Sequence, residues 1–171
     1  MPATTRGDLR GDGLRVAVLV ARWNAGITDR LRDGALAVLV RAGVRDADIA
    51  VVEVPGAFEL PQAALAVAKT GRFDAVVALG CVLKGETPHD EHIARACAEG
   101  LQHAALTTGV PTTFGVITGA TEAQAKARSD LATGAGGKGG HKGMEAAEAA
   151  VRLADALRQL SKGPGGQRLA P

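Results

Sequence analysis

The chain has 171 residues, of which 46% are hydrophobic and 22% charged, and its formal net charge is +2. This size and apolar content predict one globular domain spanning residues 1–171, and the lack of basic runs interleaved with aromatics argues against a nucleic-acid partner. No apolar run reaches the ~20 residues that cross a bilayer, and the N-terminus lacks the apolar segment of a secretory signal, so we expect a cytoplasmic protein with no membrane partner.

The first half of the chain predicts a βαβ unit. Residues 14–21 (LRVAVLVA) and 47–54 (ADIAVVEV) form runs that are apolar on both faces, as in parallel strands covered by helices. Between them, apolar residues recur at helical spacing, with Thr28 as a candidate N-cap and Gly43 as a C-terminal stop.

The rest of the chain continues the alternation of strands and helices. The patterns predict strands over 74–83 and 112–119, and helices over 59–71, 88–108, 121–132 and 143–160. This order predicts an α/β fold with three layers, α/β/α, around a central four-stranded parallel sheet. Residues 1–13 and 161–171 lack periodicity, so we expect an N-terminal arm and a flexible tail on either side of a core over 14–160.

Cysteines are few in this sequence. Cys81 and Cys97 are the two present, which is too few for a disulfide framework, and their spacing does not match a zinc site. We therefore expect both thiols to be reduced and packed in the interior.

Two aromatic residues follow predicted strands, where ligands of open parallel sheets bind. Trp23 comes after the first strand and Phe58 after the second, with Asn24 and Glu59 beside them. The aromatics either pack in the core or offer a stacking surface for a planar ligand. Asn24 could be a turn residue and Glu59 an acid in a first helical turn, but both can also hydrogen-bond hydroxyl groups.

The segment LKGETPHD (83–90) leads from the third strand into a helix. Thr87 is a candidate N-cap, with Pro88 at N1 and Asp90 at N3, which is close to a capping box. A glycine turn before a helix N-terminus also presents N–H groups and a positive dipole end, which suits a phosphate. Pro88 lacks an N–H and Glu86 is negative, so the turn would need a cation from elsewhere.

Histidines near this turn allow two further interpretations. His89, expected at N2 of the helix, is either a solvated surface residue or a group that exchanges protons near neutral pH. His89 and His92 share a helix side, but HExxH and a third ligand are absent, so we expect no metal. The stretch GAGGKG (134–139) fits GxGxxG but follows a helix rather than a strand, and it is not a Walker A loop.

Five ordered segments resemble the 6,7-dimethyl-8-ribityllumazine synthase family of riboflavin biosynthesis: ARWNAGITDRLRDGA, VEVPGAFELPQAA, ALGCVLKGETPHDEHI, PTTFGVITGATEAQAKAR and KGGHKGMEAA. The resemblance extends from about Arg15 to Leu160. It implies a flavodoxin-like fold and a transferase that condenses 5-amino-6-(D-ribitylamino)uracil with 3,4-dihydroxy-2-butanone 4-phosphate. The products would be 6,7-dimethyl-8-ribityllumazine, phosphate and water, and the reaction would need neither metal nor cofactor.

The resemblance also implies roles for residues at matching positions. Trp23 would stack on the pyrimidine, and His89 would be the catalytic acid and base. The other substrate-binding residues would be Asn24, Ala57, Phe58 and Glu59 on the ribityl side, Val82 and Leu83 at the pyrimidine, Gly85, Glu86, Thr87 and Arg128 at the phosphate, Lys142 near the site, and Phe114 from the adjacent subunit.

Members of this family are pentamers or shells built from pentamers, so the resemblance implies a homo-oligomer, at least a pentamer, with active sites between subunits. The segment SDLATGAGG (129–137) is several residues longer than the family's usual connection between the last two helices, and it is rich in glycine. Because that connection lies where pentamers pack into shells, we expect a free pentamer. Trp23 replaces the commoner Phe, and Pro88 replaces a residue that would carry an N–H.

Overall fold

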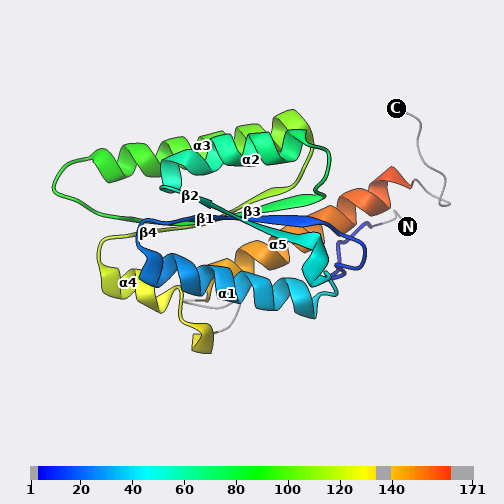
Figure 1. Ribbon diagram of the computed structural model, residues 1–171, viewed down its shortest axis with the longest axis horizontal. Coiled ribbons are helices and arrows are strands. Elements are labelled where there is room, and N and C mark those ends of the chain that lie inside the picture. Colours follow the sequence, from blue (N-terminus) through cyan, green and yellow to red (C-terminus); the bar gives the residue numbers. More distant parts are fainter. Residues whose placement is uncertain (1–3, 134–139, 163–171) are drawn as a thin grey trace.

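The computed structural model describes residues 4–133 and 140–162, which fold into three layers (Figure 1). The middle layer is a 4-stranded parallel sheet with the order β2-β1-β3-β4. Its strands are β1 (Val16–Ala21), β2 (Ile49–Val54), β3 (Ala75–Leu83) and β4 (Thr112–Gly119). The predicted sheet is therefore confirmed.

Helices cover both faces of this sheet (Figure 1). One face carries α2 (Leu60–Lys69) and α3 (His89–Thr108). The other carries α1 (Ala25–Arg41), the short α4 (Glu122–Ala127) and α5 (Lys142–Ser161). Short 3-10 helices are η1 (Asp46–Asp48), η2 (Ala57–Glu59) and η3 (Leu131–Thr133). The predicted α/β/α layering is confirmed.

Alternate side chains of β1 enter two separate cores. Val16, Val18 and Val20 pack with residues of α1 and α5, whereas Ala17, Leu19 and Ala21 pack with residues of α2 and α3. Every β1 residue is buried, which explains why the sequence shows an unbroken apolar run rather than an alternation. Each fully buried Val or Leu stabilises the fold by about 1.5–3 kcal/mol.

Two helices begin at residues that differ from the sequence-based expectation. α1 starts after Asn24, which is left-handed with φ 61°, so the predicted N-cap Thr28 lies inside the helix and is buried. α3 starts at His89 with Pro88 as its N-cap, so Thr87 is not the cap and His89 is at N1 rather than N2. The Pro88 carbonyl accepts the first helical bond, from the Glu91 N–H at 3.1 Å, and the expected capping box does not form. At the other end of α1, Gly43 has φ 96°, as expected of a helix stop.

The helix predicted over 121–132 is shorter than expected. The Thr121 hydroxyl caps α4 by accepting from the Gln124 N–H at 3.3 Å, and Arg128 is already the C-cap. The chain then turns at the buried Ser129, which lets the Arg128 carbonyl accept from the Lys142 N–H at 2.9 Å. The glycine-rich stretch 134–139 lies outside the described residues.

The N-terminal arm packs against the last helix. Residues 4–13 form no helix or strand, but the Asp8 N–H donates to the Asp155 carboxylate at 2.9 Å and Gln159 donates to the Arg6 carbonyl at 3.1 Å. A Cβ at Gly7 would lie 1.7 Å from the Arg152 carbonyl oxygen, so only glycine allows this approach. Of the predicted tail, Ser161 belongs to α5, and residues 163–171 lie outside the described part.

No helix in the described ranges is both long and apolar enough to cross a membrane.

Candidate functional site

The direction of chain winding reverses between β1 and β3. After β1 the chain continues to β2 on one side of the sheet, and after β3 it continues to β4 on the other side. Ligands of open α/β sheets bind beyond the strand ends at such a switch point. Asn24 lies there, and its Nδ2 donates to the Cys81 carbonyl of β3 at 3.0 Å. Its side chain therefore ties the end of β1 to β3 at the expected ligand position.

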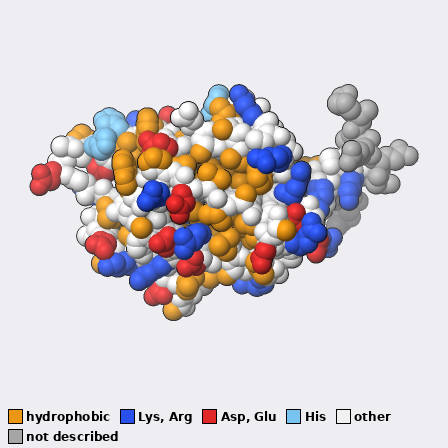
Figure 2. Space-filling view, viewed as in Figure 1, with side chains coloured by type: hydrophobic (Ala, Val, Ile, Leu, Met, Phe, Trp, Pro, Cys, Tyr) orange, Lys and Arg blue, Asp and Glu red, His pale blue; other side chains and the backbone are white. Residues whose placement is uncertain are grey.

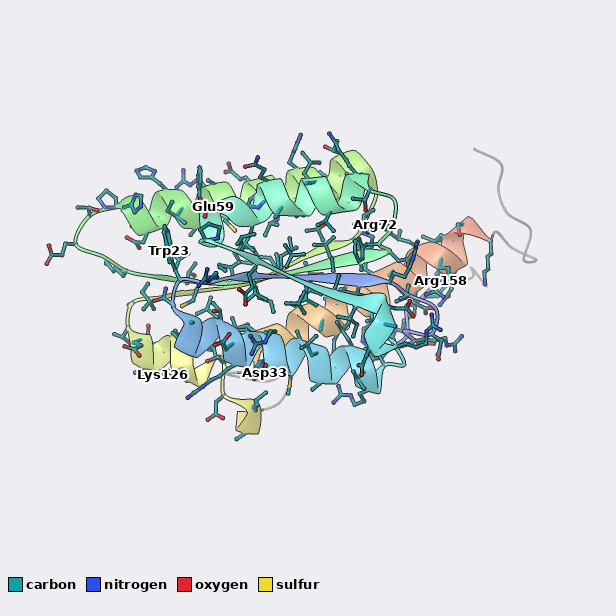
Figure 3. The ribbon with its side chains drawn as sticks, viewed as in Figure 1. Trp23, Asp33, Glu59, Arg72, Lys126 and Arg158 are labelled. Carbon is teal, nitrogen blue, oxygen red and sulfur yellow. The ribbon has the colours of Figure 1, made fainter. Side chains whose placement is uncertain are left out.

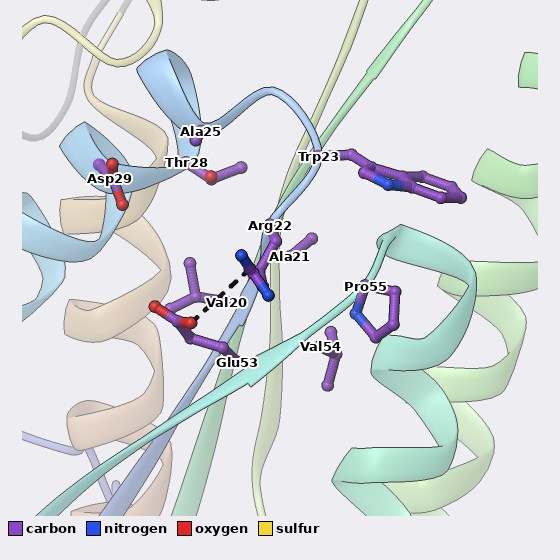
Figure 4. Close-up of a pocket in the computed structure, with 10 residues that line it drawn as sticks. All are labelled: Val20, Ala21, Arg22, Trp23, Ala25, Thr28, Asp29, Glu53, Val54 and Pro55. Carbon is purple, nitrogen blue, oxygen red and sulfur yellow. Dashed lines mark ion pairs between the residues drawn. The ribbon is translucent and has the colours of Figure 1, made fainter.

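A cavity of about 680 Å³ opens where β1 and β2 end (Figure 4). Its lining includes Arg22, Trp23, Glu53 and Pro55, and the Arg22 and Glu53 side chains approach to 3.9 Å. Trp23 is 66% exposed and Phe58 is 56% exposed. Core packing therefore does not account for either aromatic, and both present apolar faces to solvent beside the strand ends.

Gly56 makes room for the Trp23 indole. A Cβ at Gly56 would lie 2.5 Å from the indole Cε3 and 2.8 Å from Cζ3. The Gly56 N–H also donates to Glu59 Oε2 at 2.8 Å, which holds the carboxylate in place. Figure 3 shows Trp23 and Glu59 at the same end of the sheet. Gly56 has no role that the sequence indicates, because only the folded contact with Trp23 reveals one.

The turn after β3 is open to solvent. Val82 is buried and Leu83 half-buried, whereas Gly85, Glu86 and Thr87 are exposed. A Cβ at Gly85 would meet no atom within 4 Å. The Gly85 N–H points to an Asp90 carboxylate oxygen 3.5 Å away, at the long limit of a hydrogen bond.

His89 follows this turn as the exposed first residue of α3. Exposure leaves its ring accessible to a bound molecule at the helix N-terminus. Ala57, the remaining residue of the expected ribityl side, is buried at the start of η2, so it can contribute backbone contacts more readily than side-chain contacts.

Arg128 and Lys142 line a second cavity, of about 500 Å³, together with Gln124, Thr118 and Gly119. Lys142 Nζ lies 2.5 Å from Glu145 Oε2, so its charge is partly compensated. No sequence motif points to Gln124 as a site residue, yet it lines this cavity, and its side chain accepts from the Ala120 N–H at 3.0 Å.

Arg128 and the Gly85 to Thr87 turn belong to different layers of one chain. Arg128 ends α4 beneath the sheet with α1 and α5, whereas the turn leads into α3 above it (Figure 1). Within the described ranges, no hydrogen bond or ion pair links the Arg128 side chain to the turn.

Phe114 lies on the edge strand β4, away from the end of β3. It is 46% exposed and pairs in register with Ala78. From Ala78 to Leu83 the sheet extends about 16 Å at ~3.3 Å per residue. One chain therefore does not bring Phe114 next to its own Trp23 and His89.

The described part of the chain contains no group of three or more His, Cys, Asp or Glu residues that could hold a metal ion. Cys81 and Cys97 are free and buried, as expected. Burial raises the pKa of the Cys81 thiol to about 11, with a smaller contribution from Glu122, and that of Cys97 to about 12, so both stay protonated at neutral pH.

Comparison with known proteins agrees with the resemblance seen in the motifs. The family model for 6,7-dimethyl-8-ribityllumazine synthase matches residues 13–158, which span the sheet and nearly all of α5. The 6,7-dimethyl-8-ribityllumazine synthase of Syntrophus aciditrophicus (strain SB) is 45% identical over 160 residues, covering 94% of this chain and 100% of the relative. The chain therefore belongs to the 6,7-dimethyl-8-ribityllumazine synthase family.

Proposed function

We propose that the condensation takes place at the carboxyl edge of the sheet, in a site completed by a second subunit. Family membership makes the chain a transferase of riboflavin biosynthesis that joins 5-amino-6-(D-ribitylamino)uracil to 3,4-dihydroxy-2-butanone 4-phosphate. The products are 6,7-dimethyl-8-ribityllumazine, phosphate and water. One observation supports the site proposal above all others. The exposed Trp23 lies at the switch point, at the same end of the sheet as the Glu59 carboxylate, which accepts a hydrogen bond from the Gly56 N–H.

The uracil would bind against the ends of β1 and β2. Trp23 offers a planar apolar face for the pyrimidine, with Val82 and Leu83 at the end of β3 as further contacts. Glu59 and Asn24 would hydrogen-bond the ribityl hydroxyls, with backbone contacts from Ala57 and Phe58. A carboxylate has two oxygens, and because the Gly56 N–H holds Oε2, Oε1 is already oriented for a ligand.

The butanone phosphate would bind at the turn before α3. The exposed Gly85, Glu86 and Thr87 backbone and the start of the long helix α3 favour an anion, and Arg128 would add a bidentate cation with Lys142 nearby. His89, next to the bound phosphate, would move the protons required when the imine forms and when phosphate leaves.

The separation of these groups within one chain supports a site shared between subunits. Phe114 lies about 16 Å along the sheet from the end of β3, and Arg128 lies in the other helix layer. Large apolar side chains are also exposed, and Figure 2 shows hydrophobic side chains gathering between the helix layers on one face. Among the large apolar residues that the structure describes, Leu106 is the most exposed, at 76%.

We therefore propose a homopentamer, free rather than assembled into a shell because the connection over 129–137 is long. A sedimentation mass of about five chains supports this state. A shell-sized particle would contradict it.

We also propose a cytoplasmic location, which the free thiols of Cys81 and Cys97 fit because that compartment keeps thiols reduced. Enrichment of the native protein in the membrane or secreted fraction of its cells would contradict this proposal.

The experiment that tests the function mixes the purified protein with both substrates and follows lumazine fluorescence and released phosphate. His89→Ala should lower turnover by about 10²-fold or more, because a positioned acid–base group contributes at least that much. His92→Ala, an exposed histidine on the same helix, is the matched control and should remain near wild type. Ligand binding without turnover in the wild-type protein would identify a non-catalytic binder instead.

A further inference from the structure

One buried histidine has no role in the site described so far. His141 is completely buried, whereas the chain's other histidines, His89, His92 and His103, are exposed. It is the N-cap of α5, and its Nδ1 accepts from the Met144 N–H at 3.2 Å. A histidine in this capping position supplies an acceptor to a helix start that would otherwise carry an unpaired donor.

The ring is wedged between α5 and α1. A Cβ at Gly34 would lie 2.2 Å from His141 Cε1, so the ring occupies the space that glycine leaves on α1. Two residues along α5, a Cβ at Gly143 would lie 2.1 Å from the Leu31 carbonyl oxygen. These two close approaches fix where α5 begins relative to α1.

The protonation state of the ring is also constrained. Because Nδ1 accepts a hydrogen bond, the neutral ring carries its proton on the buried Nε2. Burial lowers the pKa of His141, although the Arg30 backbone and the carboxylates of Asp130 and Glu145 partly oppose this effect. The ring therefore stays neutral at physiological pH, and its cap is maintained.

Lys142, the residue after His141, connects the N-terminus of α5 to Arg128 at the end of α4. The Lys142 N–H donates to the Arg128 carbonyl at 2.9 Å, and both side chains line the same cavity of about 500 Å³. The backbone at residues 141 and 142 thus connects the start of α5 to the end of α4. A shift of the His141 peptide would move Lys142 directly and Arg128 through this bond.

We propose that His141 is a positioning residue for Arg128, the proposed phosphate-binding cation, and for the neighbouring Lys142. This inference rests on the phosphate role proposed for Arg128. A merely structural role would lower thermal stability and affect both substrates alike. A positioning role raises the KM for the phosphate-bearing substrate selectively, because the uracil contacts lie on other elements.

The test compares two variants in the intact oligomer. His141→Leu keeps an apolar side chain of similar volume but removes the acceptor, whereas His141→Asn retains an acceptor suited to an N-cap. His141→Leu should raise the KM for the butanone phosphate about fivefold while changing the KM for the uracil less than about twofold. His141→Asn should restore the KM for the butanone phosphate to within about twofold of wild type.

Equal rises in both KM values, no rise at all, or failure of Asn to improve on Leu would each overturn the inference. If His141→Leu does not fold, Gly34→Ala displaces the ring while keeping the histidine and should give the same selective rise. Arg128→Ala, measured in parallel, separates the two proposals. If Arg128→Ala leaves the KM for the butanone phosphate unchanged, Arg128 has no phosphate role and the positioning role of His141 is wrong as well. If Arg128→Ala raises that KM and His141→Leu does not, only the positioning role of His141 is wrong.

Discussion

Replacing Gly56 by Ala should weaken binding of the uracil substrate without disturbing the fold. The new Cβ would lie 2.5 Å from Cε3 of Trp23, whereas non-bonded carbons prefer about 3.5 Å or more. The indole must therefore move by about 1 Å. Because Trp23 is 66% exposed, its ring can turn toward solvent without shifting core residues.

The size of the effect follows from what the displaced ring would contribute. An aromatic stacking pair is worth about 0.5–1.5 kcal/mol, so the KM for the uracil should rise about two- to twelvefold. Gly56 has φ −147° and ψ −177°, an extended conformation that alanine adopts readily. Thermal stability should therefore change by less than about 3 °C.

The assay measures steady-state lumazine formation with the uracil varied, together with thermal unfolding. Gly26→Ala is the matched control, because a Cβ there meets no atom within 4 Å although the residue is close to Asn24. Trp23 is the only tryptophan in the chain, so its emission reports directly whether the indole has moved. A changed emission with an unchanged KM, or an equal rise for Gly26→Ala, would refute the stacking role of Trp23.

Three further predictions use the same assays. Arg128→Ala should raise the KM for the butanone phosphate about tenfold and more than that for the uracil, and equal effects would argue against a phosphate contact. Gly143→Ala places a Cβ 2.1 Å from the Leu31 carbonyl oxygen and should lower the melting temperature by about 6 °C or more, so an unchanged melting curve would show that α5 can move away freely. Asp155 has a lowered pKa in the folded protein, chiefly because its carboxylate accepts a hydrogen bond from the Asp8 N–H and secondarily one from Gln159. The ionised carboxylate therefore stabilises the fold above about pH 4, the ordinary pKa of an aspartate, and this stabilisation is lost as the pH falls through the lowered pKa of the folded state. The stability gap between wild type and Asp155→Asn, measured by denaturant unfolding, should therefore shrink in acid, and a constant gap would contradict this linkage.

Much of the fold could be predicted because its strands are local apolar runs. β4 covers the predicted residues 112–119, and β1 is apolar on both faces because it lies in the middle of the sheet between two helix layers. The helix starts were less predictable. Thr28 and Thr87 are both good capping residues in isolation, but the actual starts depend on Asn24 reaching the Cys81 carbonyl and on the turn after β3.

The motifs indicate which residues could make up the candidate site, but not how those residues are arranged. Resemblance in the motifs suggests Trp23, His89 and Arg128 as site residues, yet no local pattern shows that Arg128 and the Gly85 to Thr87 turn lie in different layers. Gly56 and His141 were missed for a related reason. Their significance depends on contacts with side chains or helices far away in the sequence, which spacing alone does not encode.

Mixing two impaired variants, His89→Ala and Arg128→Ala, tests most directly whether the site is shared between subunits. In a ring, His89→Ala subunits supply an intact Arg128 side and Arg128→Ala subunits supply an intact His89 side, so about one interface in four of a random mixture is wild type. After the subunits are dissociated and reassembled together, and with the butanone phosphate well below its KM, the mixture should therefore recover about a quarter of the wild-type rate, whereas Arg128→Ala alone gives about a tenth and His89→Ala alone about a hundredth or less. If reassembled hybrids, verified by mass, show no more activity than the separate variants, the site lies within one chain and the proposed shared arrangement is wrong.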